Sequence, residues 1–207
     1  MNDMNARKSR FTMYPVLTGL IALVSVLSSA PTAAAEFESG GYVGLGYGLY
    51  KEDSTGGFSV IKTGGAFKAY FGYQIKDYIG FEVGKTDFGD LKYDIGSGNV
   101  DRVEFDTYFA RVNGYLPVWR DGKQMTALSL GLGALRWDTR EEVKNSVGAV
   151  TSLARGHGAG AVGAAGLLVR GQNSAFRVEY EFYTGMETFN VGDTDIGQWS
   201  VNLMFYF

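Results

Sequence analysis

The sequence contains no cysteine, only three prolines and a single histidine in 207 residues. A chain without cysteine forms no disulfide, no thiolate metal site and no cysteine nucleophile. Catalysis that depends on histidine would have to use His157. No apolar stretch reaches the roughly 18 residues, flanked by charge, that a membrane-spanning helix needs. These absences argue against a disulfide-stabilised module, a cysteine-based zinc site and a helical membrane anchor.

The N-terminal segment has the pattern of a secretory signal peptide. A basic start is followed by an apolar run and then by small residues: Arg7, Lys8 and Arg10, residues 16–27, then Ala33, Ala34 and Ala35. The apolar run is too short to cross about 30 Å of hydrocarbon as a helix. We predict a cleaved signal peptide at residues 1–35 and one mature domain at residues 36–207. The mature part has 21 acidic and 16 basic residues, so we expect no nucleic acid partner.

Glycine and aromatic residues are abundant, with 30 Gly, 14 Phe and 13 Tyr, and this composition favours β-sheet over helix. After Gly40, apolar residues recur at every second position, which is the period of a strand with one apolar face. Eight such segments follow one another: residues 42–50, 66–75, 78–86, 105–116, 126–135, 156–171, 175–183 and 199–207. The sixth is so rich in glycine and alanine that the pattern does not distinguish its two faces.

The connections between these segments alternate in length. Four connections are long: residues 51–65, 87–101, 138–154 and 185–195. Three are short: residues 76–77, 117–124 and 171–174. Bacterial outer-membrane barrels have an even number of strands, short periplasmic turns and longer external loops. We therefore predict an all-β fold, an eight-stranded antiparallel up-and-down transmembrane β-barrel whose first and last strands pair. The segment GFSVIKTGG, residues 57–65, also has the composition of a strand extension above the membrane.

The face of these segments that carries charge is expected to line the barrel interior. It holds three cations and three carboxylates: Lys68, Arg111, Arg177, Glu82, Glu179 and Glu181. An eight-stranded barrel is just wide enough inside for side chains, so we predict that these groups pair in a structural salt-bridge network. The opposite face is apolar and aromatic, as a lipid-facing band requires. The alternative is a soluble sandwich or lipocalin-like barrel with the charges in water, but export, the lack of cysteine and the loop pattern favour the membrane barrel.

The last segment, WSVNLMFYF, ends on an aromatic residue. We predict that its alternate apolar residues face lipid and that the terminal ring lies at the periplasmic interface, where aromatic rings are favoured. These positions also resemble the C-terminal signal that the barrel-assembly machinery reads in outer-membrane proteins: Val201, Leu203, Phe205 and Phe207. The glycine that is frequent five residues before the last residue of that signal is Asn202 here.

Five segments, in their order and spacing, resemble the outer membrane protein A-like β-barrel superfamily over the whole mature chain: GGYVGLGYG, IGFEVGKTDFGD, YFARVNGYLPV, LSLGLGAL and FRVEYEFY. The resemblance implies a location in the outer membrane. There we expect a monomer in contact with outer-membrane lipid, lipopolysaccharide and the barrel-assembly machinery, with no cofactor and no metal. Larger members continue into a peptidoglycan-binding domain that this sequence does not show, so we expect no cell-wall tether.

Members of that superfamily serve as structural barrels, adhesins, narrow solute passages and, in distant barrels, lipid-modifying enzymes. A lipid A hydrolase would need a nucleophile beside His157, but no serine follows it on its strand and Ser152 precedes it. Glu179 and Glu181 have the spacing of residues that face one lumen, which explains them without glycoside chemistry. The four long connections hold 12 acidic and 5 basic residues, which argues against binding polyanions.

We therefore expect a non-enzymatic protein with a structural role in the envelope or a surface-interaction role through its external loops. The alternatives are a narrow small-solute porin, an adhesin and a lipid-A-modifying hydrolase. A surface partner would meet apolar residues in the connections 51–65 and 87–101: Phe58, Val60, Ile61, Tyr93 and Ile95.

Overall fold

The computed structural model describes residues 39–54, 59–60, 64–94, 100–122, 124–144, 148–188 and 192–207. The signal peptide predicted for residues 1–35 lies outside this part of the chain, as do Phe58, Ile61 and Ile95. The strands are β1 (Gly40–Ser54), β2 (Ser59–Val60), β3 (Gly64–Lys76), β4 (Ile79–Asp94), β5 (Val100–Asp121), β6 (Gln124–Lys144), β7 (Val150–Arg170), β8 (Ser174–Thr188) and β9 (Gly192–Tyr206). No helix among the described residues is long and apolar enough to cross a membrane.

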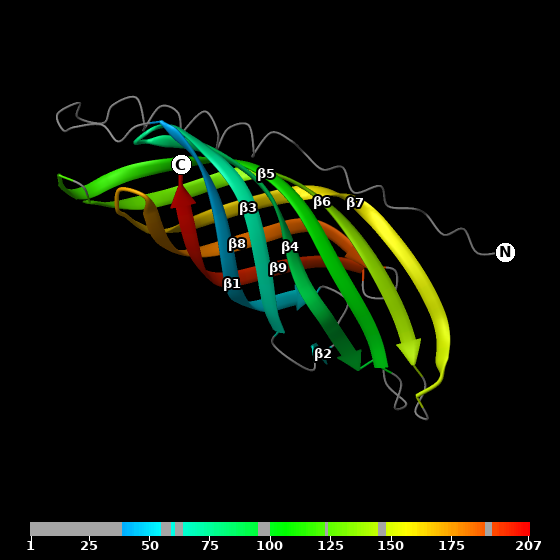
Figure 1. Ribbon diagram of the computed structural model, residues 1–207. Coiled ribbons are helices and arrows are strands. Elements are labelled where there is room, and N and C mark those ends of the chain that lie inside the picture. The colour runs from blue at the N-terminus through cyan, green and yellow to red at the C-terminus, as the bar shows by residue number, and fades with distance from the viewer. Residues whose placement is uncertain are drawn as a thin grey trace.

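The eight long strands close into an antiparallel ring, which confirms the predicted fold (Figure 1). The order around the ring is β4, β3, β1, β9, β8, β7, β6 and β5, and β5 pairs again with β4. The first and last long strands pair from Tyr42 opposite Tyr206 to Ser54 opposite Thr194. The two-residue strand β2 adds to the end of β4, so part of the segment 57–65 does form a strand extension.

Along each strand the side chains alternate between the interior and the outer wall, on the faces that the sequence predicted. In β8, Phe182 is exposed on the outer wall, whereas Glu181 is buried inside. The glycine- and alanine-rich β7, whose facing the pattern left open, places Leu167 outside and Leu168 inside. Its register is fixed by pairing with β6 and β8 on either side rather than by its own composition.

The long connections are much shorter than predicted, because the strands continue into them. β4 runs to Asp94 and β5 begins at Val100, so most of the predicted loop 87–101 is strand. β6 and β7 extend in the same way into residues 138–154, and the predicted loops 51–65 and 185–195 are also largely strand. The ring therefore carries an extended sheet at the end where these connections lie, the long-connection end.

The predicted loops were wrong because the polarity of the two faces inverts along the strands. Near the middle of β5, Tyr108 faces outward while Arg111 is buried inside. Toward the long-connection end of the same strand, Glu104 faces outward, whereas Val103 and Phe105 are buried inside. The period of two residues continues, but the apolar side chains change sides. Such a change is expected where the outer wall leaves lipid and enters water, because charged side chains can then stand on it.

The opposite end of the barrel carries the short turns. The connection predicted for residues 117–124 is shorter than expected, since β5 continues to Asp121 and β6 begins at Gln124. Gly122 lies in this turn with φ of 49°, a left-handed conformation that favours glycine. The C-terminal strand also ends here: the backbone N–H of Phe207 donates to the carbonyl of Gly41 over 3.0 Å, and Figure 1 shows the C-terminus away from the long connections.

Candidate functional site

The six charged residues predicted to line the lumen come together in the middle of the barrel. Lys68 is on β3, Glu82 on β4, Arg111 on β5, and the other three follow one another at alternate positions of β8. All six are buried, with exposed fractions of 0 to 1%. They are Lys68, Glu82, Arg111, Arg177, Glu179 and Glu181. The alternation of each strand turns them inward, and the closed ring places the strands that carry them across one narrow lumen.

Each carboxylate in this central charge cluster contacts at least two cations. Glu82 accepts hydrogen bonds from Arg111 Nε at 2.7 Å and from Arg177 Nη1 at 2.7 Å. Lys68 Nζ donates to Glu179 Oε1 at 2.6 Å and to Glu181 Oε1 at 2.8 Å. With three cations and three carboxylates the cluster is electrically neutral. Neutrality matters because an uncompensated charge in a buried site costs several kcal/mol.

Polar side chains around the central charge cluster add further hydrogen bonds to its carboxylates. The Tyr42 hydroxyl donates to Glu82 Oε1 at 2.8 Å, the Ser200 hydroxyl donates to Glu181 Oε2 at 3.1 Å, and Asn202 Nδ2 donates to Glu179 Oε1 at 3.1 Å. The centroid of the Tyr70 ring lies 5.2 Å from Lys68 Nζ, so the ring also contacts this cation. These contacts hold the carboxylates in fixed positions, as a buried ionic network requires.

Glycines on the inner face make room for the aromatic rings. A Cβ on Gly44 would lie 2.2 Å from Cζ of Tyr70, and one on Gly72 would lie 2.2 Å from Cζ of Tyr42. Neither position could carry a side chain unless the ring moved. The glycines therefore let an eight-stranded lumen hold tyrosines next to the central charge cluster.

A layer of apolar side chains fills the lumen between the central charge cluster and the long-connection end. Its buried members are Tyr50, Phe88, Val103, Phe105, Leu135, Trp137, Tyr183, Met186 and Ile196. The ring of Phe88 lies edge-on to Tyr50 at 5.5 Å and to Tyr183 at 5.0 Å. The sequence reading missed this layer. The sequence did contain a signal for it. Val103 and Phe105 are an even number of residues away from Arg111 on the same strand, so period-two alternation puts all three on the inner face.

A third layer lies on the other side of the central charge cluster, toward the short-turn end. Tyr42 packs against Tyr206 with ring centroids 5.0 Å apart, and the guanidinium of Arg170 lies 4.0 Å from the centroid of Tyr206. Near the turns, Arg120 forms an ion pair with Asp77 at 2.6 Å. In the described part of the chain, the lumen thus holds three successive layers of side chains: an apolar layer, the central charge cluster and an aromatic layer.

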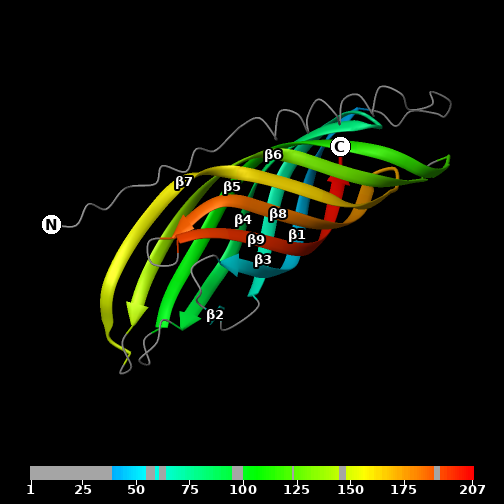
Figure 2. The same ribbon diagram turned by 180° about the vertical axis from the view of Figure 1, so that it is seen from behind.

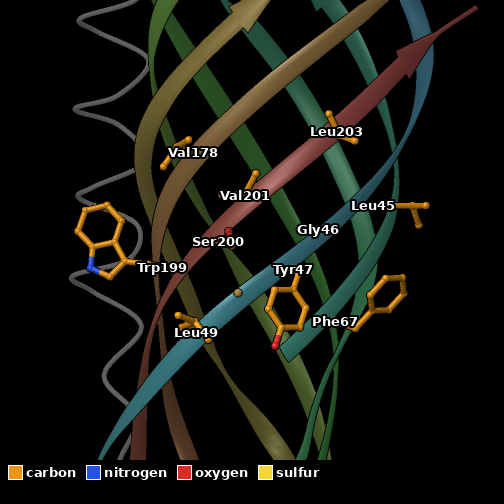
Figure 3. Close-up of a pocket in the computed structure, with 11 residues that line it drawn as sticks. Leu45, Gly46, Tyr47, Leu49, Phe67, Val178, Trp199, Ser200, Val201 and Leu203 are labelled. Carbon is orange, nitrogen blue, oxygen red and sulfur yellow. The ribbon is translucent and has the colours of Figure 1, made fainter. Parts of the chain in front are cut away.

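The outer wall carries the apolar band that the sequence predicted. Large side chains on it are 40 to 75% exposed in the isolated chain, among them Leu45, Phe71, Leu130, Phe182, Leu203 and the terminal Phe207. The predicted C-terminal assembly residues Val201, Leu203, Phe205 and Phe207 all belong to this wall. On β1 and β9 the wall is hollowed by a groove of about 610 Å³ (Figure 3). Tyr47 and Phe67 stand on one side of it and Trp199 on the other. An outer surface of this composition is suited to contact with lipid acyl chains.

The residues considered for enzymatic chemistry do not form a site. His157 is exposed on β7, opposite Asp138 of β6. Ser152 is on the same strand, and a separation of five residues along a strand corresponds to about 16 Å. Glu179 and Glu181 are both engaged by cations of the central charge cluster. No group of three or more His, Cys, Asp or Glu residues within the described ranges could hold a metal ion.

Comparison with known proteins supports the same architecture. The attachment invasion locus protein Ail of Yersinia pestis, in complex with the heparin analogue sucrose octasulfate, has a TM-score of 0.53 at 14% identity, over 82% of this chain and 99% of that one. The N-terminal β-barrel domain of OprF from Pseudomonas aeruginosa has a TM-score of 0.54 at 10% identity, over 82% and 100%. Neisserial surface protein A has a TM-score of 0.53 at 18% identity, over 82% and 99%.

At these identities the three structures show a shared fold. No curated protein sequence matches the chain. The model of the outer membrane protein beta-barrel domain family, however, matches residues 20–207, nearly the whole sequence. The chain therefore belongs to the outer membrane protein beta-barrel domain family and is a protein of the outer membrane.

Proposed function

We propose that this protein is a non-conducting, non-enzymatic barrel that anchors a surface-exposed sheet in the outer membrane. The observation that carries the proposal is the set of buried side chains in the lumen. The neutral central charge cluster lies between an apolar layer and an aromatic layer, and apart from the partly buried Tyr206 the side chains of these layers are buried. A barrel of this kind supplies a stable wall and a fixed platform, and its interaction surface is the part that extends beyond the membrane.

The orientation follows from the rule for bacterial barrels, in which short turns face the periplasm and long connections face the outside. The sheet at the long-connection end would then project from the cell surface. It is built mainly from β5, β6 and β7, which have 22, 21 and 21 residues. A strand needs only about 9 to 11 residues to cross the membrane, so a large part of each strand lies beyond the lipid.

A narrow porin is the alternative that this interior disfavours. A solute would have to displace the apolar layer and also separate Glu82 from Arg111 and Arg177, which it contacts at 2.7 Å. Breaking such a buried pair costs about 3 to 5 kcal/mol. An open state with that cost would be rare, so steady conduction is not expected.

Conductance across planar lipid bilayers tests the proposal. The unmodified protein should give a closed trace, with incorporation verified by recovering folded protein from the same membranes. Arg111→Ala removes one cation and its side-chain volume from the lumen, and we expect brief openings in this variant only. A steady conductance from the unmodified protein would contradict the sealed lumen and favour the porin.

A lipid-A-modifying hydrolase is disfavoured by the separation of its would-be residues. Exposed His157 has no nucleophile beside it in the described part of the chain, and the buried carboxylates are paired with cations. Mass spectra of lipid A from cells with and without the protein should be identical. A lipid A species that appears only with the protein would show an enzymatic activity.

Export and assembly complete the proposal. We infer that the signal peptide is removed before Glu36, and that Val201, Leu203, Phe205 and Phe207 are read by the barrel-assembly machinery. The exposed alternate positions of β9 support this role, because all four side chains are available on the outer wall. Ail was crystallised with a heparin analogue, but the acidic excess in residues 51–65, 87–101, 138–154 and 185–195 here does not favour a polyanionic partner.

A further inference from the structure

Strand β7 has an unpaired edge over half of its length. On one side it pairs with β6 from Val150 opposite Lys144 to Arg170 opposite Met125. On the other side it pairs with β8 only from Ala161 onward, where Ala161 lies opposite Thr184. Among the described residues, 150–160 therefore have a strand partner on one side only. Figures 1 and 2 both show this part of β7 at the outer border of the projecting sheet, apart from β8.

The separation of β8 from β7 is built into the fold. Gly185 of β8 has φ of +78°, and the pairing of β8 with β9 shifts register between Tyr183 and Met186. The indole Nε1 of Trp137, on β6, donates to the carbonyl oxygen of Gly185 over 2.9 Å. The same indole lies under β7, where a Cβ on Gly158 would come within 2.4 Å of it. Trp137 therefore covers the inner side of the gap between β7 and β8, and β8 does not run alongside residues 150–160 of β7.

The edge lacks most of the features that usually prevent strand addition. Proteins protect exposed edges with proline, charged side chains such as lysine, β-bulges, inward-pointing charges or a covering segment, and of the charged side chains this edge carries only Arg155. Residues 150–160 read VTSLARGHGAG, with no proline, no lysine and no acidic residue. Leu153 is 54% exposed, and every second residue of an unpaired edge directs its N–H and C=O away from the sheet. An extended polypeptide could add to this edge by backbone hydrogen bonds, a recurring mode of recognition.

The charge next to the edge selects the chemistry of the partner. Arg155 lies directly opposite Arg140 of β6, and both are exposed. Neither forms an ion pair with another described residue, and like charges at directly opposed positions are destabilising. A carboxylate placed beside Arg155 by an added strand would relieve this repulsion. Two copies of the edge paired together would instead bring further arginines close to each other.

We propose that residues 150–160 of β7 form a docking edge for an extended polypeptide segment of a partner protein that places one carboxylate beside Arg155. The inference rests on the proposed function in one respect, the exposure of the sheet at the cell surface. Its test uses binding, whereas the sealed lumen is tested by conductance, so the two can fail separately.

The experiment uses the purified chain in lipid nanodiscs and a fluorescent nine-residue peptide of alternating valine and threonine in which the central threonine is replaced by glutamate. Binding is followed by fluorescence anisotropy, and amide hydrogen exchange maps the site. We expect the peptide to slow exchange in residues 150–160. Two further peptides serve as probes: the same sequence with N-methyl groups on alternate residues, which removes hydrogen-bond donors, and the same sequence with lysine in place of the glutamate.

Two charge variants separate the edge from general electrostatics. Arg155→Glu should weaken binding of the glutamate peptide about fivefold or more and should increase binding of the lysine peptide, because it turns a cross-strand attraction into a repulsion. Lys85→Glu reverses an exposed charge on β4, which β5 and β6 separate from β7, and should leave binding within about twofold. Equal binding of the N-methylated peptide, or exchange protection outside residues 150–160, would overturn the proposal. So would protection of these residues by self-association in the absence of peptide.

Discussion

The pair of Glu82 and Arg177 gives a sharp test of the sealed interior. Both side chains are fully buried, and Glu82 accepts two hydrogen bonds from Arg177, at 2.7 and 3.2 Å. Glu82→Gln removes one negative charge from a cluster of three cations and three carboxylates, so one cation is left without compensation. Removing one partner of a buried pair costs about 3 to 5 kcal/mol. We expect the free energy of unfolding to fall by this amount.

Arg177→Met should have a similar cost, because it leaves the opposite excess of charge. The double variant restores neutrality, so its destabilisation should be smaller than the sum of the single effects by about 1 to 3 kcal/mol. The matched control is Lys85→Met, which breaks the pair of Lys85 and Asp106 on the outer wall at 2.8 Å. Those two side chains are 41% and 45% exposed, and an exposed pair contributes only about 0 to 1 kcal/mol.

The assay is urea unfolding of the protein refolded into lipid vesicles, followed by the fluorescence of its three tryptophans. The reasoning would be refuted if Glu82→Gln cost no more than the Lys85→Met control. It would also be refuted if the double variant lost as much stability as the two single variants together. In either case the six charged side chains would not act as one dry, neutral network.

Three further predictions concern the wall and its assembly. Gly166→Ala should destabilise the barrel by about 1 to 3 kcal/mol or more, because its Cβ would lie 2.2 Å from a backbone oxygen of β8. Gly163→Ala is the control and should be tolerated, because a Cβ there has no neighbour nearer than 3.9 Å. Unfolding in lipid vesicles compares the stability of the two variants. Leu130→Arg should cost about 2 to 4 kcal/mol by the same assay, and equally exposed Leu153→Arg should cost little because it lies beyond the lipid. Phe207→Ser should lower the amount of folded barrel in outer-membrane fractions, and unchanged amounts would contradict its role in assembly.

Period-two alternation predicted most of the lipid-spanning barrel, because one physical rule holds there: apolar side chains face lipid and polar ones face the lumen. Where the outer wall leaves the lipid, the rule reverses, and Glu104 stands outside while Phe105 is buried inside. A continuous apolar face ends at this reversal, so the sequence pattern predicted loops where the strands in fact continue toward the long-connection end. A search for alternation of either sign would have continued through residues 102–112 of β5.

The central charge cluster was predictable in membership but not in its contacts. Alternation alone placed Arg177, Glu179 and Glu181 on the inner face of β8. Which cation meets which carboxylate depends on the stagger of the strands around the ring, and that is set by long-range pairing. The unpaired edge of β7 escaped the sequence for the same reason, since it depends on where β8 stops following β7. The pattern within residues 150–160 contains no sign of a missing neighbour.

A scan of β6 with spin labels tests directly whether its outer wall faces lipid and then water. The sequence has no cysteine, so each cysteine introduced to carry a label is unique. Labels at Leu128, Leu130 and Leu132 in lipid vesicles should collide mainly with dissolved oxygen, which concentrates in the hydrocarbon. Labels at Arg136 and Arg140 should collide mainly with a water-soluble nickel chelate. Equal access of the nickel chelate to all five positions would contradict a lipid-facing wall whose polarity inverts beyond the membrane.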